Sequence, residues 1–266
     1  KNSKIIFFVL FFLLISINIA QENINRYEAA DGKIMAIWPH NNRFKSVEKL
    51  RELKERWGFN YLLIAAIYGE KEKEMAKEAG FDSLHIAFQV YLPDMTNNRD
   101  AFISNIESLG KIYAYYFDEP VSRKHSYMDF LRLIKFLSDN GYYPHAKFLI
   151  SELDERKGAQ VLNLVDEVLY SGYGGINNGG LDQVKTWNEW RAFLGEKFAS
   201  SWIGAHEDFN EYPVLFKAAK DLNFNGVWFY QLEPLDEDKE VDDANFEKFC
   251  EAAVEFGFMR PIPTLP

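Results

Sequence analysis

Short runs rich in β-branched and aromatic residues alternate with amphipathic segments along most of the chain. The short runs are apolar at nearly every position, whereas apolar residues in the longer segments recur every three or four positions. This pattern predicts strands at residues 33–38, 61–68, 84–91, 112–117, 145–150, 167–170, 198–204 and 227–232. It predicts helices at residues 46–57, 72–79, 99–109, 127–139, 159–165, 181–193, 212–222 and 245–256.

Consecutive strand–helix units of this kind predict an α/β fold, a single (β/α)8 barrel. Strands that are apolar on both faces belong to parallel sheets covered by helices. Right-handed crossovers close eight such units into a barrel of about 250 residues. A doubly wound open sheet is the alternative, but it would be expected to carry a glycine-rich phosphate loop after an early strand, and none is present. We therefore expect residues 21–266 to form one barrel domain.

The first twenty residues have the layout of a secretory signal peptide. Lys1 and Lys4 precede an apolar run at residues 5–17, and Ala20 places a small residue at the expected cleavage point. The run is short for a membrane span, and no cysteine follows to take a lipid. We predict that residues 1–20 are removed and that the protein is secreted or periplasmic, with no membrane contact after cleavage.

The charge and cysteine content of the chain limit the classes of molecule that it can be expected to bind. Forty acidic residues against thirty basic ones give a formal charge of −10, which argues against nucleic acid and anionic membranes. The single cysteine, Cys250, excludes an internal disulfide, and its place in a predicted helix indicates a buried structural thiol. We expect a monomer.

The strand ends carry the candidate chemistry, because the active sites of (β/α)8 barrels lie at the carboxyl ends of their strands. Carboxylates, amides and aromatic residues dominate these positions, which suits the binding of neutral, hydroxyl-rich molecules. The most informative is the end of the fourth predicted strand, where the chain runs directly into Asp118 and Glu119 and then turns at Pro120.

This turn resembles that of the clan A glycoside hydrolases, retaining (β/α)8 enzymes with an Asn-Glu-Pro-like turn after strand four and a second Glu after strand seven. The resemblance implies that Glu119 is the acid/base and Glu207 the nucleophile, with carboxyl groups about 5–5.5 Å apart. Asp118 departs from the pattern, because clan A enzymes have Asn there. The Asp-Glu pair is also similar to that of substrate-assisted hexosaminidases, in which Asp118 would orient the substrate's acetamide and Glu119 would protonate the leaving oxygen.

Each candidate carboxylate has a structural alternative. Asp118 or Glu119 would otherwise cap the following helix or pair with Arg123, and Glu207 would be a solvated loop residue. If Glu207 is not the second carboxylate, Glu233 is the next candidate. Glu70 and Glu152 follow it.

Aromatic rings near the strand ends are the second indication, because sugar rings pack their CH faces on Trp and Tyr. The candidate substrate-binding residues are Trp38, His40, Tyr68, Gln89, Tyr116, Tyr170, Tyr173, His206, Trp228, Gln231 and Glu233. For each aromatic residue, packing in the core is the alternative. No metal or other cofactor is expected, since adjacent residues such as His206, Glu207 and Asp208 seldom converge on one ion and no His-Glu-x-x-His spacing occurs.

Together these observations predict an exported glycoside hydrolase that acts on an oligo- or polysaccharide. Two further classes remain open. A non-catalytic carbohydrate-binding barrel would keep the aromatic residues and lose one carboxylate of the pair. A lyase, deacetylase or other sugar-modifying barrel would carry a metal or a basic residue at the floor of its site.

Overall fold

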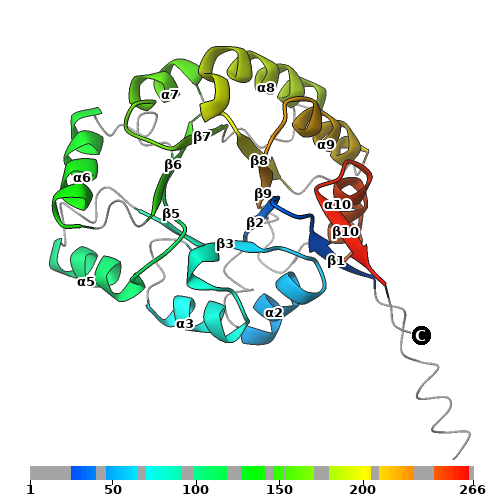
Figure 1. Cartoon of the computed structure of the whole chain (residues 1–266), viewed down its shortest axis with the longest axis horizontal. Coiled ribbons are helices and arrows are strands. Elements are labelled where there is room, and N and C mark those ends of the chain that lie inside the picture. The colour runs from blue at the N-terminus through cyan, green and yellow to red at the C-terminus, as the bar shows by residue number, and fades with distance from the viewer. Residues whose placement is uncertain are drawn as a thin grey trace, which may run out of the picture.

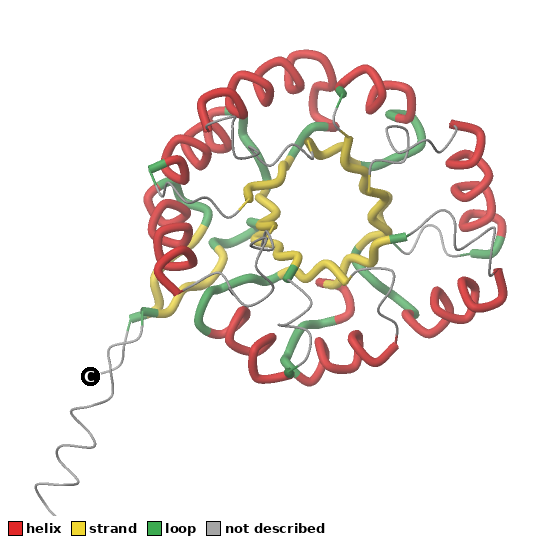
Figure 2. Tube along the Cα trace, turned by 180° about the vertical axis from the view of Figure 1, so that it is seen from behind, coloured by secondary structure: helices red, strands yellow, loops and turns green. Residues whose placement is uncertain are grey.

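The computed structural model describes residues 25–39, 46–64, 70–90, 99–118, 127–141, 146–152, 154–170, 180–204, 210–230 and 243–263. These residues form an inner ring of parallel strands surrounded by helices, as the two opposite views show (Figures 1 and 2). The strands are β2 (Ile34–Trp38), β3 (Tyr61–Ile64), β4 (Ile86–Gln89), β5 (Ala114–Asp118), β6 (Lys147–Glu152), β7 (Glu167–Tyr170), β8 (Ser200–Gly204) and β9 (Gly226–Tyr230). The surrounding helices are α2 (Val47–Glu55), α3 (Glu70–Glu78), α5 (Arg99–Leu109), α6 (Tyr127–Asp139), α7 (Glu155–Val161), α8 (Gly180–Leu194), α9 (Glu211–Asp221) and α10 (Asp243–Glu255). The prediction of a (β/α)8 barrel is confirmed.

The strand ladder follows the order β7-β6-β5-β4-β3-β2-β9-β8, so that β2 near the start of the barrel pairs with β9 near its end. Among the residues that the structure describes, no backbone ladder joins β7 to β8. Side chains connect them instead. Ser200 Oγ donates a hydrogen bond to the carboxyl of Glu167, and Ser201 Oγ donates to the carbonyl oxygen of Tyr170 over 3.3 Å. The barrel is therefore nearly closed, with a seam held by serine hydroxyls.

Burial raises the pKa of the Glu167 carboxyl, and Asp166 raises it further, against the lowering effects of the Ser200 hydrogen bond and Lys147. The folded protein therefore keeps this proton over a pH range in which the unfolded chain has lost it. From about pH 4.3, the ordinary glutamate value, up to the raised pKa, the free energy of unfolding falls as the pH rises.

We expect Glu167→Gln to remove this fall, because Gln stays neutral and its carbonyl still accepts from Ser200. The gain at neutral pH should be about 1.4 kcal/mol for each unit by which the pKa is raised. Urea unfolding between pH 4 and 8 measures it, with the exposed Glu189→Gln on α8 as the control. If the free energy of unfolding varied with pH in the same way in wild type and Glu167→Gln, Glu167 would not be a buried, protonated group at the seam.

Strand alternation divides the core into two layers. Side chains on the outer face, such as Phe88, Ile150 and Phe229, pack against the helices. Those on the inner face fill the barrel, where small residues on β2, β4 and β5 (Ala36, Ala87 and Ala114) leave room for large ones on β5, β8 and β9. The large inner residues are Tyr116, Trp202 and Trp228. The interior is a packed core, as the fold requires.

An antiparallel ribbon, which the pattern analysis did not predict, joins β1 (Arg26–Ala29) to β10 (Met259–Ile262). It lies at the edge of the barrel beside α10 (Figure 1). The Tyr27 ring stacks on Trp57 with centroids 6.4 Å apart, and Tyr27 N donates to the Arg56 carbonyl. Gly58 permits this approach, because a Cβ there would lie 2.7 Å from the Tyr27 carbonyl carbon and the residue has a φ of 73°. The pairing thus depends on tertiary contacts rather than on a local pattern.

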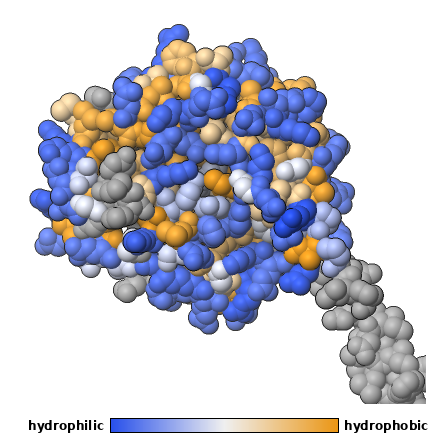
Figure 3. All heavy atoms as spheres, in the orientation of Figure 1, coloured by the Kyte–Doolittle hydropathy of each residue, from blue (hydrophilic) through white to orange (hydrophobic). Residues whose placement is uncertain are grey.

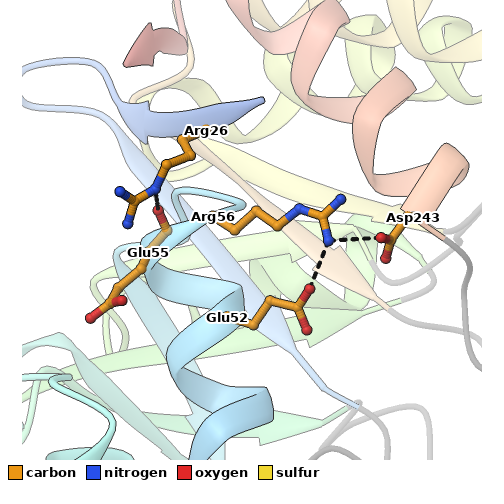
Figure 4. A network of polar contacts seen from close by, with 5 residues as sticks. All are labelled: Arg26, Glu52, Glu55, Arg56 and Asp243. Atoms are coloured by element: carbon orange, nitrogen blue, oxygen red, sulfur yellow. Dashed lines mark hydrogen bonds and ion pairs between the residues drawn. The ribbon is translucent and has the colours of Figure 1, made fainter. Parts of the chain in front are cut away.

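Arg56 connects three of these elements (Figure 4). From the end of α2 its guanidinium reaches Glu52 at 2.9 Å and Asp243, the first residue of α10, at 2.7 Å. The same guanidinium lies over the Trp57 ring, 4.2 Å from its centroid. Arg26 on β1 adds a 3.2 Å hydrogen bond to the Glu55 carbonyl. The ribbon, α2 and α10 are therefore held together by cations as well as by packing.

Several predicted boundaries differ from the structure by two to four residues, and side-chain caps explain two of these differences. The helix expected at 159–165 begins at Glu155, because Asp154 accepts a 2.8 Å hydrogen bond from Arg156 N and caps it. The strand expected at 84–91 begins only at Ile86. Asp82 accepts from Leu84 N at 2.7 Å, and a short 3₁₀ turn at Ser83–His85 replaces the first part of the strand.

Cys250 is buried, as predicted, and burial raises the pKa of its thiol well above the ordinary value. The face shown in Figure 3 is mainly hydrophilic with interspersed apolar patches. No helix in the described ranges combines the length and apolar character needed to cross a membrane. Residues 1–20 lie outside those ranges, so the signal peptide stays a prediction.

Candidate active site

The carboxyl ends of the strands bring a set of polar and aromatic residues to the inner face of the barrel. Asp118 at the end of β5 lies opposite Ser151 on β6 in the ladder, and Trp38 on β2 lies opposite Tyr230 on β9. Gln89 at the end of β4 is opposite Tyr116 and shares its face. Ser151 is fully buried, whereas the other end residues are partly exposed.

Asp118 points into the barrel rather than toward the helices. Its Oδ1 accepts a 3.2 Å hydrogen bond from Ser151 Oγ, and Tyr116 OH lies 3.5 Å from the same oxygen. Tyr116 is two residues earlier on the strand and therefore on the same face. Its hydroxyl is also 2.6 Å from Ser151 Oγ. An inward carboxylate at a strand end is the position in which this fold places its chemistry.

Aromatic rings of β2, β8 and β9 line the inner face of the barrel on strands distant from β5 in the ring. Trp38 and Tyr230 pack together with centroids 5.1 Å apart, and Trp202 lies 6.0 Å from Trp38. One pleat deeper, Tyr116 and Trp228 stack at 6.3 Å and are fully buried. The deeper rings therefore act as packing beneath the site. Trp38 and Tyr230 are the partly exposed rings that a substrate would meet.

The structure separates the predicted binding residues. Trp38, Gln89, Tyr116 and Trp228 share the inner face with Asp118. Tyr170 does not, because it lies on the outer face of β7 and packs against Trp190 of α8 with centroids 5.1 Å apart. A ring in that position faces the helical layer, so the structure does not bring Tyr170 together with the inner-face residues.

Several predicted residues lie outside the described ranges: Glu119, Glu207, His40, Tyr68, Tyr173, His206, Gln231 and Glu233, together with Arg123. Of the two remaining reserve carboxylates, Glu70 is the first residue of α3. Glu152 is fully buried on β6. By strand alternation it faces away from its inward neighbour Ser151.

The sequence pattern did not single out three inner-face residues near the strand ends: Ser151, Trp202 and Tyr230. Alternation counted back from the strand ends is the signal for Trp202 and Tyr230, since each shares its parity with the last residue of its strand. Ser151 gains its role only from the register between β5 and β6, which no single-strand pattern contains.

Within the described ranges, no group of three His, Cys, Asp or Glu side chains is arranged to hold a metal ion. The chemistry available there is that of carboxylate, hydroxyl, amide and indole groups.

No protein-family model matches the chain, and neither does any curated protein sequence. Among solved structures, active domain 2 of the thermostable chitinase from Pyrococcus furiosus matches with a TM-score of 0.56 at 13% identity, over 86% of this chain and 98% of that one. The chitinase from Chromobacterium violaceum matches with a TM-score of 0.55 at 8% identity, over 82% of this chain and 98% of that one. The fold is that of the chitinase barrels. A D-psicose 3-epimerase matches with a TM-score of 0.49 at 11% identity, over 84% and 99% of the two chains.

At these identities the similarity to chitinase barrels establishes the fold alone. It agrees with the expected (β/α)8 glycoside hydrolase architecture. The reaction that such a barrel catalyses depends on its site residues and not on the fold.

Proposed function

We propose that this protein is an exported glycoside hydrolase that cleaves glycosidic bonds of 2-acetamido sugars, with Asp118 and Glu119 as its working carboxylates. The observation that carries the proposal is the inward Asp118 at the carboxyl end of β5, whose Oδ1 accepts a hydrogen bond from Ser151 and lies 3.5 Å from the Tyr116 hydroxyl. In the substrate-assisted alternative the aspartate of the pair has to face the substrate, and its position on the inner face meets that requirement.

The chemistry follows from the two carboxyl groups. As the glycosidic bond breaks, the proton of Glu119 passes to the leaving oxygen, while the carbonyl oxygen of the substrate's acetamide forms a bond to the anomeric carbon. Asp118 accepts a hydrogen bond from the acetamide N–H and stabilises the positive charge that develops there. Water, deprotonated by Glu119, then attacks the anomeric carbon. This attack breaks its bond to the acetamide oxygen and regenerates the acetamide. The product keeps the configuration of the substrate.

Substrate specificity tests the proposal. We expect release of 4-nitrophenol from 4-nitrophenyl 2-acetamido-glycosides, and cleavage of chito-oligosaccharides, but no turnover of the matched glucosides that lack the acetamide. Proton NMR of the first product anomer should show retention. Cleavage of the glucosides would instead support direct attack by Glu207, and binding without cleavage would leave a carbohydrate-binding barrel.

Trp38 should contribute a stacking surface for the sugar. We expect Trp38→Leu to raise KM about three- to tenfold with a smaller effect on kcat, since an aromatic contact is worth about 0.5–1.5 kcal/mol. Tyr170→Leu is the matched control, because it removes a ring on the outer face of the barrel. Equal effects of the two substitutions on KM would show that Trp38 acts through packing rather than through substrate contact.

A further inference from the structure

A directed chain of hydrogen bonds runs through the barrel floor to Asp118. Trp202 Nε1 on β8 donates to Tyr116 OH on β5 over 3.2 Å. Tyr116 OH donates to Ser151 Oγ on β6 over 2.6 Å, and Ser151 Oγ donates to Asp118 Oδ1 over 3.2 Å. All three donors are fully buried.

Chemistry fixes the direction of this chain at both ends. An indole N–H can only donate, and an ionised carboxylate can only accept. The Tyr116 hydroxyl accepts from the indole, and its single proton goes to Ser151 Oγ at 2.6 Å rather than to Asp118 Oδ1 at 3.5 Å. The Ser151 proton is then directed to Asp118. The O–H directions of Tyr116 and Ser151 are therefore determined by their neighbours in the chain. Hydrogen bonds to a charged acceptor are stronger than those between neutral groups.

We infer that Trp202, Tyr116 and Ser151 are positioning residues that keep Asp118 ionised and hold its Oδ1 toward the barrel floor. This inference rests on the proposed function in that Asp118 is taken to act on the substrate. The hydrogen-bond chain itself does not depend on which sugar is cleaved. Its members come from three strands, so the barrel register determines the state of the carboxylate.

The inference can be tested without a substrate. Protein carrying ¹³C at its Asp carboxyls is titrated by NMR, and the Asp118 resonance is assigned by its loss in Asp118→Asn. We expect Ser151→Ala to move the half-ionisation of Asp118 up by about one pH unit, a tenfold change in its ionisation equilibrium. Tyr116→Phe should move it less, because the Ser151 hydroxyl still donates, and Trp202→Phe should have the smallest effect.

Ser201→Ala is the matched control, since it removes a buried serine hydroxyl from the other face of β8. It should leave the Asp118 titration unchanged. An unchanged titration in Ser151→Ala, with the fold intact by circular dichroism, would overturn the inference. Ser151→Ala and Tyr116→Phe each remove few atoms, so folding of the barrel should survive both.

Kinetics separate this inference from the proposed function. On a cleaved substrate, the acid limb of the kcat/KM profile should move to higher pH in Ser151→Ala by the amount seen in the titration, which a purely structural role would not produce. If the wild type cleaves no glycoside while the titration shifts as expected, the proposed function fails and the positioning chain stands. If the wild type cleaves a 2-acetamido glycoside but the Asp118 titration is unchanged in Ser151→Ala, the proposed function stands and the positioning role of the hydrogen-bond chain is wrong.

Discussion

Replacement of Glu119 by Gln should lower the turnover of a glycoside substrate by about a hundredfold or more, the contribution of a positioned general acid. Gln keeps the shape of the side chain and lacks the proton that the leaving oxygen requires. Thermal stability should barely change, because Gln has nearly the same size and shape as Glu. Initial rates at saturating substrate and a melting curve measure both quantities.

Glu155→Gln is a suitable control, since it makes the same chemical change in the first turn of α7. It should retain full turnover. A Glu119→Gln protein that turns over a confirmed substrate at the wild-type rate would remove Glu119 from the mechanism. A large drop in melting temperature would instead identify it as a structural residue.

Asp118→Asn should also reduce turnover by about a hundredfold or more if the acetamide is the nucleophile, because the negative charge that balances the developing positive charge is lost. Asn keeps an oxygen that Ser151 can reach, so the hydrogen-bond geometry around the site is largely preserved. The loss should appear in kcat more than in KM. Asp154→Asn, at the N-cap of α7, repeats the substitution at a carboxylate that serves a helix end and should affect stability alone.

Direct retention through Glu207 gives the opposite result. In that case Asp118→Asn would lower turnover less than tenfold, and Glu207→Ala would abolish it. Azide should then restore part of the activity of Glu207→Ala by attacking the open face of the anomeric carbon. The two mechanisms are therefore separated by two variants, Asp118→Asn and Glu207→Ala, and one added nucleophile.

Periodicity was sufficient to predict the barrel because each strand–helix unit buries its own apolar face. The helices at Arg99–Leu109 and Tyr127–Asp139 lie where the three-to-four spacing predicted them. The β1–β10 ribbon was not predicted because its two four-residue strands carry charged residues and a proline, and its position depends on tertiary contacts such as the stacking of Tyr27 on Trp57. Such pairings are decided by the assembled molecule.

The candidate site was predictable only in part, for a related reason. The composition of the strand ends indicated Asp118, and alternation from the buried Tyr116 places its carboxyl inward. The same reasoning does not place Tyr170, which lies on the outer face, because a strand of four residues does not reveal which of its two faces points inward. Ser151 belongs to the site through the register of β5 against β6, which depends on barrel geometry rather than on either sequence segment.

Closure of the ring by β2 against β9, with the β1–β10 ribbon beside it, has a consequence for biosynthesis. A chain emerging from the ribosome can form the ladder from β2 through β7 without β9, the strand that pairs with both β2 and β8. Its two sheet edges stay open until almost the whole sequence has been made. Contacts between such distant segments are slow to form, and open edges are prone to aggregation. The last strands synthesised therefore control how long the nascent protein depends on chaperones.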